Sequence, residues 1–273
     1  MMKYVVFLDI LGFKERLKAL SQGDAERFIG DFSTTIYNLW ERNNDFNQHL
    51  KGYIVSDSLI INTKSVSLES LEILLSAVEQ ICRAEFSENS ILLRGAIAKG
   101  EFDKLEAKEL KSLGKGLIVG QAYVDAYLLE GTVKTLGIVL SKNVYEDILT
   151  LNAPSKYAIM EEVVNTEKHY VFRYLSIDYL LDSKHLERFV RLAETAKWLP
   201  HYYNALYFSL KNEDGKKSVQ VFENIVKIIN GNEPSEHWRS LNQFIKNCFN
   251  DDVVSDCQTR FLTFLRGNIV NGK

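Results

Sequence analysis

The chain has 273 residues, of which 46% are hydrophobic and 25% are charged, and its formal net charge is −3. This composition is typical of globular proteins, and the length allows one large domain or one domain with an added segment. The weak negative charge gives no overall positive field to hold a nucleic-acid backbone, so nucleic acid is disfavoured as a partner. The 3 cysteines form no C-x-x-C pair, which indicates reduced thiols in the cytoplasm rather than a disulfide framework.

The chain begins with a pattern typical of a central β-strand. Residues 3–8 are nearly all apolar, with one lysine at the start, and Asp9 and a charged stretch follow them, so the pattern does not indicate a signal peptide. No later stretch has the roughly 18 consecutive apolar residues of a membrane-spanning helix. After a short amphipathic stretch, further elements are expected in chain order: a helix over 24–40 capped by Asp24, a hairpin over 52–62, a helix over 71–81, a strand over 91–97, a helix over 120–131, and strands over 136–140, 157–160 and 169–174.

This order of elements predicts an α/β (α+β) sandwich with one mixed central sheet. Residues 103–116 are rich in Lys, Glu and Gly without an apolar period, and we expect them to form a mobile excursion. Beyond residue 182 the composition changes to amphipathic segments with helical spacing. We therefore expect one domain over 1–181 and an all-helical region over 182–273 that serves dimerisation or regulation.

Two aspartates stand where strand patterns end. Asp9 ends the first strand, and Asp57 lies at the tip of the hairpin. Either one alone is typical of a solvated turn, but two such acids on neighbouring strands suit Mg²⁺ or Mn²⁺ ions that also bind phosphate oxygens. Gly12, between Leu11 and Phe13, lets backbone N–H groups at a strand-to-helix turn approach a phosphate. Together these features predict a triphosphate site.

Four segments resemble, in order and spacing, successive motifs of the class III nucleotidyl cyclases. They are FLDILGF at 7–13, VSDSLII at 55–61, LLRGAIAKGEF at 92–102 and GQAYVDAYLLE at 120–130. The SDS, RGAI and AYLLE segments are similar to those of the bacterial pyrimidine cyclases of the Pycsar antiphage system, which make cyclic UMP or cyclic CMP. The resemblance covers about residues 3–150. It implies a ferredoxin-like cyclase sandwich, a homodimer with sites at the protomer interface, and a downstream effector protein activated by the cyclic nucleotide.

The resemblance also implies roles for individual residues. Asp9 and Asp57 match the family's metal-binding aspartates, which hold two divalent ions, and the carbonyl of Ile10 matches a further metal ligand. One ion activates the ribose 3′-hydroxyl for attack on the α-phosphorus, and the other holds the triphosphate and neutralises the leaving pyrophosphate. Phe7 and the turn from Leu11 through Gly12 to Phe13 are expected to line the triphosphate.

The position that reads the base differs from that of purine cyclases. Those enzymes place Lys or Glu four residues before the second aspartate, where this chain has Tyr53. A tyrosine there is expected of the pyrimidine cyclases, because its ring packs flat against a base while its hydroxyl forms a hydrogen bond. The partner base-reading position is Leu117, which forms no side-chain hydrogen bond. An ordinary strand aromatic at position 53 is the alternative.

A second difference concerns the transition state. Many cyclases carry an Asn that orients ribose and an Arg that stabilises the transition state at positions that align with Val124 and Leu128. Phosphoryl transfer needs a cation, so another residue must provide it if the protein is active. Arg94 is the first candidate, and Lys99 is the second and a candidate nucleotide contact.

The resulting hypothesis is a cytoplasmic, metal-dependent cyclase that converts UTP, or else CTP, into its 3′,5′-cyclic monophosphate and pyrophosphate in antiphage defence. Two alternatives remain open. One is an inactive cyclase-like nucleotide sensor or dimeric scaffold, in which Arg94 forms only a structural ion pair with Glu101 or Glu130. The other is a nucleotidyltransferase that joins two nucleoside triphosphates with the same pair of ions.

Overall fold

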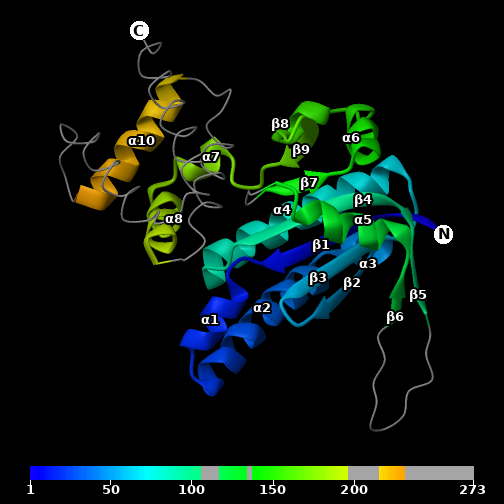
Figure 1. Ribbon diagram of the computed structural model, residues 1–273, viewed down its shortest axis with the longest axis horizontal. Coiled ribbons are helices and arrows are strands. Elements are labelled where there is room, and N and C mark those ends of the chain that lie inside the picture. Colours follow the sequence, from blue (N-terminus) through cyan, green and yellow to red (C-terminus); the bar gives the residue numbers. More distant parts are fainter. Residues whose placement is uncertain (106–116, 134–136, 196–214, 231–273) are drawn as a thin grey trace. The chain divides into compact units, whose positions relative to one another are not determined.

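The structure is a computed structural model that describes residues 1–105, 117–133, 137–195 and 215–230 (Figure 1). These residues fall into two compact units. The first unit contains the described residues of 1–10, 20–133 and 138–172, and the second contains those of 11–19, 134–137 and 173–273. No helix in the described ranges is long and apolar enough to cross a membrane.

The first unit is built on a seven-stranded sheet with the strand order β2-β3-β1-β4-β7-β9-β8. The strands are β1 Met2–Ile10, β2 Leu50–Val55, β3 Ser58–Thr63, β4 Leu93–Glu101, β7 Ile138–Leu140, β8 Ile159–Val164 and β9 Glu167–Phe172. The helices of this unit are α2 Gln22–Arg42, α3 Asn44–His49, α4 Leu68–Asn89, α5 Gln121–Glu130 and α6 Lys142–Leu149, with a short 3₁₀ turn at Pro154–Lys156.

The first four strands of this sheet form a ferredoxin-like core. The chain runs from β1 through helices to the hairpin β2–β3, then through α4 to β4, which is the β-α-β-β-α-β order. All pairs within β2-β3-β1-β4 are antiparallel, whereas β4 and β7 pair in parallel. The sheet is therefore mixed, and the predicted α+β class with a ferredoxin-like mixed sheet is confirmed.

Helix α2 covers one face of the sheet. Val6 of β1 pairs with Ile61 of β3, which in turn pairs with Gly52 of β2. Directly paired residues point to the same face of a sheet. A Cβ atom at Gly52 would lie 2.9 Å from the Trp40 ring of α2, so this face is the one that α2 approaches. The absence of a side chain at Gly52 thus lets the indole lie against the strand.

Helix α5 packs against the opposite face (Figure 1). Val5 and Phe7 of β1 alternate with Val6, and they form a buried cluster with Ala122 and Ala126 of α5. The small alanine side chains let the helix approach the strands closely. The odd-numbered residues of β1, among them Phe7 and Asp9, therefore belong to the α5 face.

The N-terminus of α2 differs from its predicted position. The helix begins at Gln22 with Ser21 as the N-cap, and the Ser21 hydroxyl accepts a hydrogen bond from the Asp24 backbone N–H at 3.3 Å. The prediction that Asp24 is the cap is therefore wrong. Asp24 occupies the third helical position, where its carboxylate accepts a 2.7 Å hydrogen bond from the Ser21 hydroxyl. The positive end of the helix dipole stabilises the negative charge of this carboxylate.

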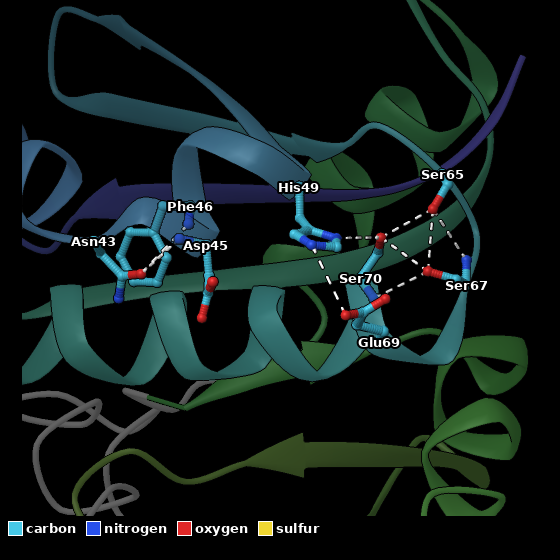
Figure 2. Close-up of polar contacts among 8 residues, drawn as sticks. All are labelled: Asn43, Asp45, Phe46, His49, Ser65, Ser67, Glu69 and Ser70. Carbon is cyan, nitrogen blue, oxygen red and sulfur yellow. Dashed lines mark hydrogen bonds and ion pairs between the residues drawn. The ribbon is translucent and has the colours of Figure 1, made fainter.

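Serines cap α4 and connect its first turn to α3 (Figure 2). Ser67 is the N-cap and accepts from the Ser70 N–H at 3.1 Å. The Ser70 hydroxyl lies 2.9 Å from that of Ser65 and 3.3 Å from Nδ1 of His49, the last residue of α3. Glu69 lies 4.0 Å from Nε2 of His49. Because Ser70 is only 1% exposed, this cluster anchors a helix end and offers no accessible nucleophile at Ser70.

Local boundaries differ elsewhere as well. The segment expected to be a mobile excursion has strands at both ends, since β5 Asp103–Leu105 pairs with β6 Leu117–Val119, and its residues 106–116 lie outside the described ranges. Strand β4 extends to Glu101 rather than ending at Ile97. Helices α3 and α6 were not predicted, because each is short and apolar periodicity is weak over six or eight residues.

The second unit contains α1 Phe13–Ala19, α7 Ile177–Leu180, α8 Ser183–Thr195 and α10 Gly215–Asn230. Helices α7, α8 and α10 contact one another, and Lys217 of α10 pairs with Asp178 of α7 at 2.9 Å. Within the expected all-helical region over 182–273, the described residues form the helices α8 and α10, and residues 196–214 and 231–273 lie outside the described ranges. The division into domains after residue 181 stays a prediction.

A buried carboxylic acid lies on α4. Glu85 is 0% exposed, and its Oε2 accepts a 2.9 Å hydrogen bond from Asn89, while Oε1 has no hydrogen-bond partner among the described residues. Burial raises the pKa of Glu85 from 4.5 to about 8; the Asn89 hydrogen bond opposes this rise, and the charges of Glu88 and Asp31 add to it.

This pKa predicts a loss of stability as the pH rises. Between the unfolded value near 4.5 and the folded value near 8, folded Glu85 keeps a proton that the unfolded chain releases, so unfolding becomes easier through this window. Glu85→Gln should raise the free energy of unfolding at pH 8.5 by a few kcal/mol and leave it nearly unchanged at pH 4.5. Urea titrations at both pH values measure this. Glu72→Gln, an exposed acid on the same helix, is the control, and an equal gain at both pH values would contradict the assignment.

Candidate active site

Asp9 lies near the C-terminal end of the central strand, on the α5 face. It pairs with Ser58 of β3 on one side and with Arg94 of β4 on the other. The Ser58 hydroxyl donates to Asp9 Oδ1 at 3.4 Å, and Arg94 Nη2 lies 3.4 Å from Asp9 Oδ2. The sheet register therefore fixes both neighbours of this carboxylate.

Asp57 is held beside the end of the same strand by the backbone. The tight turn between β2 and β3 includes Ser56 in the left-handed region at φ 56°, and the Ile10 N–H donates to the Asp57 carbonyl at 3.1 Å. The two aspartates predicted as a pair thus lie near each other, at one end of the neighbouring strands β1 and β3. Ile10, the predicted backbone ligand, follows Asp9 in the chain and bonds to Asp57 through its N–H.

The proximity of the two carboxylates appears in the acidity of Asp9. Burial and the negative charge of Asp57 together raise the pKa of Asp9 from 3.8 to about 6, and burial is the larger cause. Arg94 opposes the shift, and Glu130 adds to it. The site thus carries an excess of negative charge that a bound cation would compensate.

Arg94 is held between two acids. Its Nε lies 2.6 Å from Oε1 of Glu130, the last residue of α5, and the two side chains are 27% and 10% exposed. Both atoms are buried, yet the N–H does not point well enough at the oxygen to form a hydrogen bond, so we describe this contact as an ion pair. Burial raises the pKa of Glu130, and the Arg94 charge opposes that rise. Glu130, one of the two partners considered from the sequence, is therefore part of this site.

Aromatic side chains continue the α5 face beyond Asp9. The Phe7 ring lies edge-to-face with Tyr127 at 5.3 Å and with Tyr123 at 6.2 Å between centroids. Tyr53 is half-buried and packs against the same cluster as Phe7. Burial raises the pKa of the Tyr53 hydroxyl, with a further contribution from Asp103. Phe7 and Tyr53 thus share a face with the aspartate, as the predicted nucleotide contacts require.

Lys99 lies on the other face of the sheet. It pairs with Tyr4, whereas Arg94 pairs with Asp9, and residues 4 and 9 of one strand point to opposite faces. Lys99 Nζ forms an ion pair with Asp147 of α6 at 2.7 Å, and the Tyr4 hydroxyl donates to the same carboxylate at 2.8 Å. Within one chain, the structure therefore does not bring Lys99 together with Asp9 and Asp57.

The remaining predicted residues are placed as follows. Leu11, Gly12 and Phe13 follow β1 directly in the chain, belong to the second unit and include a left-handed Gly12 at φ 74°, a conformation that favours glycine. Nothing is described for the side chain of Leu117 in β6. Val124 and Leu128 lie on α5 with 44% and 63% of their surface exposed.

The donor set of this site fits a divalent cation bound together with phosphate. Asp9, Asp57 and the Ile10 carbonyl offer oxygen atoms only, which suits Mg²⁺ or Mn²⁺. In the described part of the chain, no three His, Cys, Asp or Glu side chains group into a metal site. A cation here would thus be held by two carboxylates and complete its shell with water and substrate oxygens, which is how Mg²⁺ commonly binds in phosphate-handling sites.

Comparisons with known proteins give structural similarities at low identity. No family model and no curated protein matches the chain. Among solved structures, the guanylate cyclase domain of RhGC from Catenaria anguillulae in complex with GTP has a TM-score of 0.48 at 15% identity, covering 63% of this chain and 95% of that one. The adenylyl cyclase CyaB from P. aeruginosa has a TM-score of 0.43 at 16% identity, covering 63% and 93%. The guanylyl cyclase domain of the RhoGC fusion protein from Blastocladiella emersonii has 0.47 at 19%, covering 63% and 93%.

The electrostatics of the site predict opposite effects of two substitutions on Asp9. Asp57→Asn removes a negative neighbour and should lower the pKa of Asp9 from about 6 toward 3.8, whereas Arg94→Gln removes a positive neighbour and should raise it. The carboxyl carbon resonance of Asp9, titrated by NMR in the presence of a chelator, reports this pKa. Asp45→Asn, on exposed α3, should leave it unchanged. Shifts in the same direction for both variants would contradict the described geometry.

Proposed function

We propose that this protein is a metal-dependent nucleotidyl cyclase whose substrate is a pyrimidine nucleoside triphosphate, UTP or CTP. The observation that carries the proposal is the pairing of Asp9 with Arg94 in the sheet beside the turn that holds Asp57. These residues stand in the segments that resemble the class III cyclase motifs. The expected products are the 3′,5′-cyclic monophosphate and pyrophosphate.

The chain's residues divide the work of this reaction. The ribose 3′-oxygen forms a bond to the α-phosphorus, the bond from that phosphorus to the oxygen that bridges to the β-phosphate breaks, and the 3′-hydroxyl gives its proton to solvent water. Asp9, Asp57 and the Ile10 carbonyl would hold two Mg²⁺ or Mn²⁺ ions. When bound, these ions lower the pKa of the 3′-hydroxyl and neutralise the leaving pyrophosphate.

Arg94 is the proposed protein cation of the transition state. Its guanidinium is always charged and offers several donors, and Glu130 holds its Nε end while Nη2 is directed to the aspartate. In this position it stabilises the negative charge that develops on the transferred phosphoryl group. Lys99 is left out of this assignment, because its ion pair with Asp147 lies on the other face of the sheet.

Base and phosphate recognition follow the resemblance. Tyr53 packs against the pyrimidine ring and its hydroxyl bonds to the base edge, while Phe7 lines the triphosphate. The product is proposed to activate a downstream effector protein in antiphage defence.

A homodimer is part of the proposal. Helix α5 carries three exposed apolar or aromatic residues, which a partner chain would cover: Val124 at 44%, Tyr127 at 55% and Leu128 at 63% exposure.

The direct test is to incubate the full chain with each of the four nucleoside triphosphates and Mn²⁺, and to identify products by mass. We expect cyclic UMP or cyclic CMP, and no product when EDTA is present. Asp57→Asn should lower turnover roughly 100-fold or more, because it removes a metal-binding charge. Its circular dichroism spectrum should match the parent, and Asp45→Asn is the control. Pyrophosphate release from none of the four nucleotides would overturn the proposal.

Base selection has its own test. Tyr53→Phe keeps the ring and loses the hydroxyl, so kcat/KM for the preferred pyrimidine should fall about fivefold, as expected for one lost hydrogen bond. Tyr53→Ala should lower it further, because the ring is lost as well. Tyr37→Phe, at an exposed position of α2, is the control for this substitution. Unchanged kcat/KM in both Tyr53 variants would assign this tyrosine to packing alone.

A catalytically inactive nucleotide sensor or scaffold is the second candidate. It is favoured by the apolar Val124 and Leu128 at the positions where many cyclases carry polar catalytic residues. Nucleotide binding measured by calorimetry without any product would select it. A product containing two nucleotides would instead identify a nucleotidyltransferase.

A further inference from the structure

A pocket separate from the candidate active site lies beside α5. It has a volume of about 440 Å³ and is lined by parts of α5, β7, β9 and the first turn of α6. Its polar lining includes Thr132, Ser141, Asn143, Lys168 and His169. Asp9, Asp57 and Arg94 are not among its lining residues.

The register of the sheet shows which way His169 points. Phe7 pairs with Ala96, Ala96 with Val139, and Val139 with Val171, so all four side chains lie on the α5 face. His169 is two residues before Val171 on the same strand and shares that face. Its side chain is therefore directed to the side of the sheet where α5 and the pocket lie.

The imidazole of His169 is open to a molecule in the pocket. His169 is 9% exposed and lines the pocket, and its ring nitrogens are not among the fully buried unpaired atoms of the described residues. An imidazole always carries at least one N–H donor. A ligand in the pocket would accept a hydrogen bond from this ring.

The first turn of α6 provides further donors. Ser141 is its N-cap and makes no side-chain capping bond; its hydroxyl donates to Asn143 Oδ1 at 2.5 Å. The free N–H groups of an eight-residue helix thus meet the pocket at the positive end of its dipole. Three lysines also line the pocket, and each pairs with an acid: Lys99 with Asp147, Lys142 with Glu146 and Lys168 with Glu161.

The rest of the lining limits the kind of ligand. Asp125 is the acid among the lining residues, and it is exposed and bonded to Gln121 at 2.7 Å. Leu128, Leu129 and Leu140 give the pocket an apolar side. A ligand that uses both sides has an anionic group next to α6 and a less polar body next to α5.

We propose that this pocket binds a small organic phosphate, with the phosphate at the α6 N-terminus next to His169. The site is separate from the aspartate pair, so the proposal does not rest on cyclase activity.

The five histidines of the chain allow a local test by NMR. Uridine monophosphate and inorganic phosphate are titrated separately into the full chain in the presence of EDTA, with chloride as the ionic-strength control. His169→Gln assigns the resonance. We expect the His169 ring signals to shift saturably with both phosphates, more tightly with the nucleotide, while those of His49 stay in place. No shift, or an equal shift with chloride, would overturn the proposal.

Variants separate this pocket from the candidate active site. Lys168→Gln should weaken phosphate binding about threefold, as expected for one exposed charge, whereas Lys51→Gln on the edge strand β2 should not weaken it. Asp9→Asn should leave the His169 titration unchanged. If Asp9→Asn abolishes the shift, the phosphate binds at the aspartates and the proposal fails, whatever the outcome of the turnover assay.

Discussion

The pairing of β1 with strands on both sides is the constraint on which the rest of this structure depends. Five residues of β1 pair with β3 and nine with β4, and the strand is buried along most of its length. This register sets Asp9 between Ser58 and Arg94. A slip by one residue would move Asp9 to the face covered by α2 and separate it from Arg94 and Glu130. The geometry of the site is thus a property of backbone hydrogen bonding before it is one of side chains.

The same backbone holds like charges together. The bond from the Ile10 N–H to the Asp57 carbonyl keeps a second aspartate beside the first, and the side chains by themselves would repel one another. Burial and this repulsion keep the Asp9 carboxyl near a pKa of 6, and Arg94 compensates only in part. Such an arrangement is costly without a cation and is typical of functional sites rather than of structural ion pairs. Glu130, at the end of α5, completes the site because its ion pair holds the Arg94 guanidinium in place.

Much of this was accessible from the sequence, and the failures have physical causes. Short apolar runs and the polar hairpin tip gave the strands, and the two aspartates were recognised as a pair. The cap of α2 was misplaced because Ser21 and Asp24 are both good N-caps, and only hydrogen bonding decides between them. Lys99 was grouped with Arg94, although the two stand five residues apart on one strand. That odd separation already implied opposite faces, and it is the signal that was missed.

The sequence by itself determined the local elements, the class of sheet and the acids at the strand ends, because these depend on periodicity and turn chemistry within a few residues. Tertiary structure alone decided whether Glu101 or Glu130 pairs with Arg94, which face of the sheet each cation occupies, and that His169 and the first turn of α6 line one pocket. Those outcomes depend on pairing between residues far apart in the chain, such as Asp9 with Arg94 and Arg94 with Glu130. The burial of whole strands and helices sets this pairing. No single short segment of the sequence therefore predicts it.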